Sequence, residues 1–120
     1  SLSSLNGEWN IIEVNGSAIV PAENQELPFI GFDTATGKVY GNSGCNRMMG
    51  SIDLNSKPGT IDMSRLGSTR MACPDMSGER ELLQALDKVV RFDAVGEVKP
   101  VNKIALYGTD NTKLMVIEKK

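Results

Sequence analysis

Short stretches in which apolar and polar residues alternate make up most of the chain. Alternation places every second side chain on one face, as expected of half-buried β-strands. Turn-forming residues separate these stretches at the spacing of roughly 8–12 residues that is typical of all-β barrels and sandwiches. The alternating sets are Trp9 with Ile11, Ile30 with Phe32, Ile61 with Met63, Val90 with Phe92 and Ala94, and Ile104 with Leu106. We count about eight candidate strands in this pattern.

Two segments depart from simple alternation. Leu114 to Ile117 is apolar on both faces, which predicts a central or well-covered strand. Ser77 to Val90 follows helical spacing instead, and its apolar stripe consists of Leu82, Leu83, Leu86, Val89 and Val90. Glu79 and Glu81 fall in the first turn of this helix, where the helix dipole favours negative charge. We therefore predict one amphipathic helix that packs on a curled sheet.

The length and composition favour a single soluble domain over residues 1–120. No internal repeat or linker divides the chain. The net charge is −2 and the basic residues are scattered, which argues against nucleic-acid binding. No run approaches the roughly 20 apolar residues that span a bilayer, so we expect no transmembrane segment. Ser1 to Ser4 contains neither a methionine nor an apolar signal core, and we expect a mature form whose leader is missing.

The sequence contains no histidine, which excludes Ser–His–Asp and Cys–His arrangements and removes the commonest metal ligand. A Ser–Lys dyad or a carboxylate pair is the remaining catalytic alternative, and it would require a cleft with convergent carboxylates. The carboxylates are spread over turns and the polar helix face, as solvated surface charges are. We therefore expect a protein that is not an enzyme and that uses no cofactor or metal ion.

The middle of the chain concentrates glycine, polar and sulfur-containing residues. Gly41 and Gly44 predict left-handed dihedrals or a close backbone approach, because the stretch lacks the Gly-Lys-Ser/Thr ending of a phosphate loop. Asn46 and Arg47 then become partly buried polar groups, and an arginine fork to Glu79 would satisfy them. The methionines of this region are Met48, Met49, Met63, Met71 and Met76. Their irregular spacing favours core packing over a copper(I) site.

The two cysteines, Cys45 and Cys73, leave two interpretations open. Two thiols without histidine do not complete a tetrahedral zinc site. Their spacing is compatible with a disulfide formed in an oxidising compartment, and equally with two buried thiols.

Several motifs follow one another in a recognisable order. The first three are Leu5-Asn6-Gly7-Glu8-Trp9, Pro28-Phe29-Ile30-Gly31-Phe32, and Val39-Tyr40-Gly41-Asn42-Ser43-Gly44-Cys45-Asn46-Arg47 with Gly50. They are followed by Ser68-Thr69-Arg70-Met71-Ala72-Cys73-Pro74 with Glu79, and by the stretches 103–107 and 113–117. From about Leu5 to Glu118 the chain thus resembles the META domain, or HslJ-like, family.

The resemblance implies an antiparallel, lipocalin-like β-barrel closed at one end by the helix. It also implies that Cys45 and Cys73 form the family's paired cysteines, and it brings no catalytic residues. The motif residues are expected to be structural: Gly7, Trp9, Gly41, Gly44, Asn46, Arg47, Gly50, Thr69, Met71 and Glu79. Members are often envelope lipoproteins or secreted proteins linked to the heat-shock or stress response.

We therefore expect a monomeric, non-catalytic binding module that is located in the cell envelope or secreted. A lipid anchor on a segment before Ser1 is an open alternative. The ligand of the module would be a protein partner or a small apolar molecule, depending on whether the barrel interior is filled. The alternative is a small β-barrel protease inhibitor that presents the loop from Pro21 to Pro28 or the turn from Asn55 to Gly59.

Overall fold

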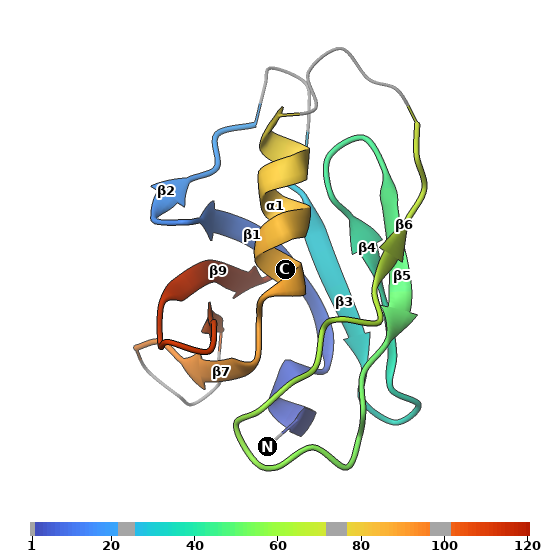
Figure 1. Ribbon diagram of the computed structural model, residues 1–120, viewed down its shortest axis with the longest axis vertical. Coiled ribbons are helices and arrows are strands. Elements are labelled where there is room, and N and C mark those ends of the chain that lie inside the picture. The colour runs from blue at the N-terminus through green and yellow to red at the C-terminus, as the bar shows by residue number, and fades with distance from the viewer. Residues whose placement is uncertain (1, 22–25, 72–76, 97–101) are drawn as a thin grey trace.

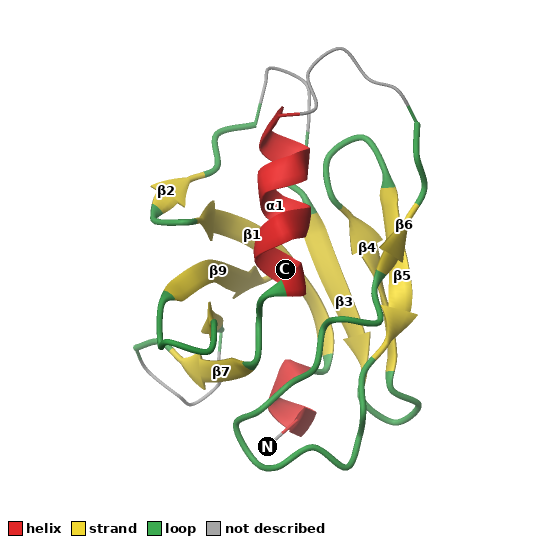
Figure 2. Cartoon of the chain, viewed as in Figure 1, coloured by secondary structure: helices red, strands yellow, loops and turns green. Residues whose placement is uncertain are grey.

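The computed structural model describes residues 2–21, 26–71, 77–96 and 102–120. Within these ranges, short strands and one α-helix follow one another along the chain (Figures 1 and 2). The elements are η1 (Leu2–Leu5), β1 (Gly7–Val14), β2 (Ser17–Ala18), β3 (Phe29–Asp33), β4 (Lys38–Asn42), β5 (Arg47–Ser51), β6 (Gly67–Ser68), α1 (Ser77–Asp87), β7 (Arg91–Ala94), β8 (Lys103–Tyr107) and β9 (Lys113–Lys119).

The strands form a single antiparallel sheet of nine strands, with the order β6-β5-β4-β3-β1-β9-β8-β7 and β2 attached to β1. The expected mostly β fold class is therefore confirmed. A fully closed barrel is not, because no ladder between described residues joins the two ends of this order, β6 and β7. A single isolated bridge, between Thr60 and Arg91, connects β7 to the segment that precedes β6.

The strand expected at Ile61 and Met63 is wrong, because this stretch forms no ladder in the sheet. The Oδ1 atom of Asp62 accepts hydrogen bonds from the backbone N–H and the hydroxyl of Ser64, at 2.9 and 2.6 Å, which turns the chain. Ile61 and Met63 are nevertheless buried. Their alternation thus correctly predicts that both side chains are buried. No strand forms, because the Asp62 side chain competes for backbone hydrogen bonds that a ladder would use.

The core fills the concave side of the sheet. Its fully buried large side chains include Trp9 and Ile11 of β1, Ile30 and Phe32 of β3, Met48 of β5, Ile104 and Leu106 of β8, and Met115 and Ile117 of β9. α1 covers this core through Leu82, Ala85 and Leu86 and contacts β1 and β9, and Val89 adds to the cover just after the helix ends. Figure 1 shows the helix lying across the sheet, with β6 on one side and β9 on the other. A filled interior leaves the outer surface and the element junctions as places for a ligand.

The helix is three residues shorter than expected, since it ends at Asp87 and not at Val90. Lys88 and Val89 donate tight-turn hydrogen bonds to the carbonyls of Ala85 and Leu86. The N–H of Val90 already bonds the carbonyl of Tyr107 in β8, so the backbone has joined the sheet. No helix in the described ranges has the length and apolar character needed to cross a bilayer.

The last strand occupies the position its two apolar faces predict. β9 pairs with β1 on one side and with β8 on the other, and Leu114 to Ile117 are all buried. Lys119, the last residue of β9, pairs with Trp9 of β1, and the N–H of Lys120 donates to the carbonyl of Glu8 in the same strand.

Candidate functional site

A buried carboxylate joins the glycine-rich loop after β4 to α1. Glu79, in the first turn of α1, is only 7% exposed. Its Oε2 atom accepts hydrogen bonds from the hydroxyl of Ser43 and from the backbone N–H groups of Cys45 and Asn46, each at 2.8 Å. Its Oε1 atom accepts a fourth hydrogen bond, from the side-chain amide of Asn46 at 2.7 Å. The carboxylate thereby fixes the loop on the helix.

Asn46 extends this network to the segment after β6. Its Oδ1 atom accepts hydrogen bonds from the hydroxyl of Thr69 at 2.8 Å and from the N–H of Met71 at 2.6 Å. Thr69 also donates its backbone N–H to the carbonyl of Arg47, and its hydroxyl oxygen accepts from the Arg47 N–H, each at 3.0 Å. Asn46 therefore uses both halves of its amide to join α1 to the segment after β6.

The hydrogen bonds of Glu79 decide its ionisation. Burial by itself raises the pKa of this carboxyl, since charge is costly away from water. The hydrogen bonds from Asn46, Ser43 and Cys45 favour the charged form and together outweigh burial, so the pKa lies below its ordinary value. Glu79 is therefore a carboxylate at neutral pH and acts as the internal anion of the loop.

The predicted arginine fork to Glu79 is wrong, whereas the network itself exists. The Arg47 side chain is exposed, and no hydrogen bond or ion pair among the described residues joins it to Glu79. Arg47 faces outward because β5 alternates and its neighbour Met48 points into the core. The side chains of Asn46 and Ser43 donate the hydrogen bonds to Glu79 that were expected from the arginine. Nothing in the local pattern marks Ser43, which lies between Asn42 and Gly44.

Three glycines of the expected set lie where a side chain would disturb this region. Gly44 has φ +132°, a left-handed value that other residues adopt at a cost, and it lets the loop turn its N–H groups toward Glu79. Gly41 faces inward in β4, where a Cβ atom would collide with the backbone carbonyl of Phe29 and approach Ile30 Cα to 3.0 Å. Gly50 is similar, since its Cβ would lie 2.9 Å from Leu66 Cα.

The expected disulfide involves one residue outside the described ranges, Cys73. Cys45 is described, and its Sγ atom lies 3.9 Å from the carbonyl oxygen of Met71, two positions before Cys73 in the sequence. The segment that leads to Cys73 thus passes Cys45. The disulfide itself stays a prediction.

The methionine-rich region divides between core and surface. Met48 and Met63 are buried, as core packing predicts, but Met49 is 50% and Met71 is 59% exposed. Met76 lies outside the described residues. The same is true of 22–25, which form part of the loop considered for protease inhibition.

A pocket lies beside this network, between α1 and β6. Its volume is about 320 Å³. Apolar side chains form much of its lining, namely Met63, Leu66, Leu83 and Leu86. Gly67 and Ser68 of β6, with Gln84 and Asp87 of α1, complete the lining. Glu79 lies one helical turn before Leu83 and Thr69 directly follows β6, so the network holds together the two elements that border the pocket.

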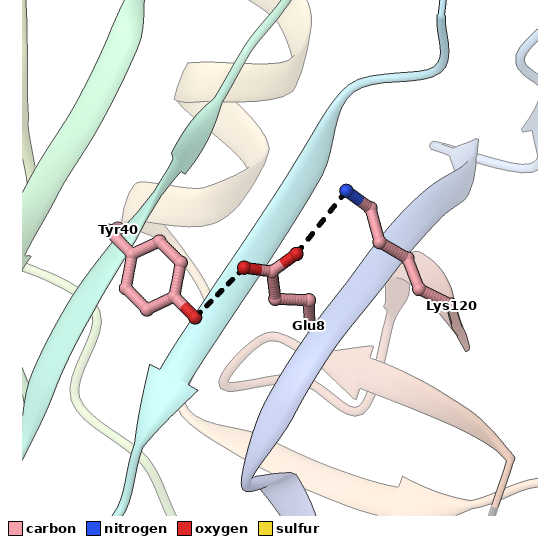
Figure 3. Close-up of polar contacts among 3 residues, drawn as sticks. All are labelled: Glu8, Tyr40 and Lys120. Carbon is pink, nitrogen blue, oxygen red and sulfur yellow. Dashed lines mark hydrogen bonds and ion pairs between the residues drawn. The ribbon is translucent and has the colours of Figure 1, made fainter.

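The outer face of the sheet carries a second polar cluster, at the C-terminal end of β9 (Figure 3). The Oε2 atom of Glu8 accepts a hydrogen bond from the hydroxyl of Tyr40 at 3.1 Å, and its Oε1 atom lies 3.4 Å from Lys120 Nζ. Lys120 Nζ also lies 3.8 Å from the centre of the Phe29 ring. Burial and the neighbouring Glu8 raise the pKa of Tyr40 above its usual value, which keeps the hydroxyl protonated.

The opening motif is tied to the same end of the chain. Trp9 is fully buried and donates its indole N–H to the Leu5 carbonyl at 2.7 Å. Lys119 Nζ lies 4.7 Å from the centre of the Trp9 ring and donates to the Asn6 carbonyl. Gly7 has φ +107°, and a Cβ atom there would collide with this lysine. The contacts of the opening motif are therefore structural.

Comparison with known proteins now places the chain. The family model of the META domain matches residues 2–120. The chain belongs to the META domain family. The motifs that indicated this family run from Leu5 to Ile117. Among their residues, Asn46, Thr69 and Glu79 form the buried network, and Gly7 and Trp9 lie at the contacts of the N-terminal strand.

Solved structures agree with this META fold. An NMR structure of a protein from Burkholderia xenovorans has a TM-score of 0.71 at 27% identity, covering 98% of this chain and 85% of that one. A crystal structure of a DUF4847 family protein from Bacteroides vulgatus has a TM-score of 0.63 at 17% identity, covering 97% and 94%. A further NMR structure has a TM-score of 0.67 at 20% identity, covering 95% and 89%. No curated protein matches the sequence.

Proposed function

We propose that this META domain is a non-catalytic binding module that takes a small apolar ligand in the pocket between α1 and β6. The observation that carries the proposal is the pocket itself, which has about 320 Å³ of space and an apolar lining beside a filled core. Small-molecule sites are typically concave, largely apolar and supplied with a few polar groups, at volumes of roughly 300–1,000 Å³.

The buried carboxylate supports a binding role more than a catalytic one. Both oxygens of Glu79 are occupied by hydrogen bonds within the protein, so this group holds structure in place. Asp87 is the one ionisable side chain among the described residues that line the pocket. General acid–base chemistry commonly uses groups with mutually perturbed pKa values, and the lining offers no such pair.

We propose further that the domain works in the cell envelope or outside the cell. The paired cysteines expected of the family support this location, because disulfides persist in oxidising compartments. Mass spectrometry after alkylation of the unreduced protein tests the disulfide on which this part of the proposal rests.

The pocket is tested with a neutral apolar fluorescent probe, N-phenyl-1-naphthylamine, and the variant Leu83→Gln. Leu83 packs against the core only partly, so a polar side chain of similar length is tolerated in α1. We expect saturable probe binding to the unmodified domain and binding roughly tenfold weaker to Leu83→Gln, since apolar contact area is lost.

The matched control is Leu54→Gln, which changes an exposed leucine, 40% accessible, outside the pocket lining. It should bind the probe as the unmodified domain does. Equal binding by Leu83→Gln and the unmodified domain would remove the pocket from consideration, as would an absence of saturable binding.

A further inference from the structure

The pocket lining contains one carboxylate, that of Asp87. Asp87, the last residue of α1, contributes an exposed carboxylate to the lining. The C-terminal end of a helix carries a partial negative charge from its carbonyl groups, and the last turn of α1 contains no basic residue. Neither Arg80 of α1 nor Lys88, which directly follows the helix, belongs to the lining. The Asp87 carboxylate and the C-terminal end of the helix therefore both favour a positively charged group at this end of the pocket.

The remainder of the pocket is uncharged. Met63, Leu66, Leu83 and Leu86 offer an apolar surface, and Gln84 adds a neutral amide. The lining thus combines an apolar region with one negatively charged carboxylate that accepts hydrogen bonds. A ligand that matches both parts needs an apolar chain and a positively charged donor at one end, whereas an anionic head group would be repelled.

From this arrangement we propose that the ligand of the pocket is a small apolar cation, a hydrocarbon chain that ends in an ammonium group. The inference rests on the binding function proposed above and names its ligand class. The chain would lie against Leu83 and Leu86, and the ammonium group would pair with the Asp87 carboxylate. An ammonium group has three donors and no acceptor, which suits an acceptor-only carboxylate.

The test compares three probes of equal chain length: octylammonium, 1-octanol and octanoate. Each is titrated into the domain at neutral pH and low ionic strength, on the order of 10 mM, where surface charges are poorly screened. Amide shifts of residues 83–87 and 67–68 in two-dimensional NMR spectra report the pocket. We expect octylammonium to bind about fivefold more tightly than octanol, and octanoate to bind more weakly than octanol, as one partly exposed charge pair allows.

The variant Asp87→Asn should remove the difference between octylammonium and octanol while it leaves octanol binding intact. Asp93→Asn makes the same charge change at an exposed position of β7 outside the pocket, and it should keep the preference. Added salt should narrow the preference in the unmodified domain.

The outcomes separate the two proposals. If octanol and octylammonium bind the pocket equally, if octanoate binds more tightly, or if Asp87→Asn keeps the preference, the charge inference is overturned and the apolar pocket stands. If none of the three probes shifts the pocket amides, the proposed binding function fails and the charge inference fails with it.

Discussion

At the scale of single residues, Glu79 and Asn46 form the most constrained pair in the described chain. Four donors surround the Glu79 carboxylate, and the Asn46 amide uses its nitrogen toward Glu79 and its oxygen toward Thr69 and Met71. Both residues are almost completely buried. Hydrogen bonds to a charged group contribute more than neutral ones, and a buried group that loses its partner carries the full cost of desolvation. A substitution at either residue should therefore destabilise the whole loop between β4 and β5.

Glu79→Gln should lower the free energy of unfolding by about 2–3 kcal/mol at neutral pH, because an amide group then faces the N–H donors of Cys45 and Asn46. The pKa of Glu79 is depressed in the folded protein. Its contribution to stability is therefore fully present above the unfolded-state pKa, about 4.3, and is lost as the pH falls through the lower folded value. Denaturant unfolding across acidic and neutral pH measures this.

The difference in stability between the unmodified domain and Glu79→Gln should shrink as the pH falls into that window. Taking the difference removes the contributions of Asp62 and Asp110, whose pKa values are also lowered by hydrogen bonds to Ser64 and Thr112. Glu81→Gln changes an exposed carboxylate on the same helix and should cost well under 1 kcal/mol. A pH-independent difference would show that Glu79 is not charged in the folded state.

At the scale of elements, the inward-facing glycines let β3, β4 and β5 curl tightly. Gly41 lies opposite Ile30 in β3 and opposite Met48 in β5. Its missing side chain makes room for the carbonyl of Phe29 and for the Met48 side chain. Gly50 admits the chain at Arg65 and Leu66 in the same way, directly before β6. The concave shape that holds α1 thus depends on the absence of two Cβ atoms.

Gly41→Ala should destabilise the domain by about 2–3 kcal/mol, since the new methyl group collides with backbone that belongs to a paired strand. Thermal or denaturant unfolding measures the change. Gly78→Ala is the control, because nothing lies within 4 Å of a Cβ atom at this helical position and alanine favours helix. It should stabilise the domain by roughly 0.5–1 kcal/mol. Equal effects of the two substitutions would refute the close-approach argument.

At the scale of the whole molecule, the described residues form one open antiparallel sheet around a core that α1 closes. The loop that carries Cys45 meets both α1 and the segment after β6, so three parts of the chain converge there. A covalent link between Cys45 and Cys73 would limit the freedom of the unfolded chain over the 73 − 45 = 28 positions between them.

We predict that Cys45 and Cys73 form a disulfide, and that its reduction lowers the free energy of unfolding by roughly 3–4 kcal/mol in the chain-entropy model. Denaturant unfolding with and without reductant gives the difference, and Cys45→Ser should behave as the reduced domain does. Mass spectrometry after alkylation of the native, unreduced protein provides the direct check. Two alkylated thiols would contradict the prediction.

Local pattern alone was sufficient for the secondary elements that depend on one-sided burial. Alternation located β1, β3, β7 and β8, and the apolar run at Leu114 located the central strand β9. Helical spacing located α1 to within one turn at its C-terminal end. Each of these elements has at least one face that is buried away from water. Its apolar residues therefore recur at fixed intervals in the sequence.

Only the tertiary structure decided which polar groups meet. The partner of Glu79 is Asn46, 33 positions away, and not the adjacent Arg47, because the pleat of β5 turns Arg47 outward. The contacts of Lys119 and Lys120 with the first strand, and the pocket between α1 and β6, likewise depend on strand register and helix docking. The periodicity of apolar residues indicates which face of an element is buried. It does not indicate which residue of a distant strand or helix packs against that face, because many strand registers bury the same faces.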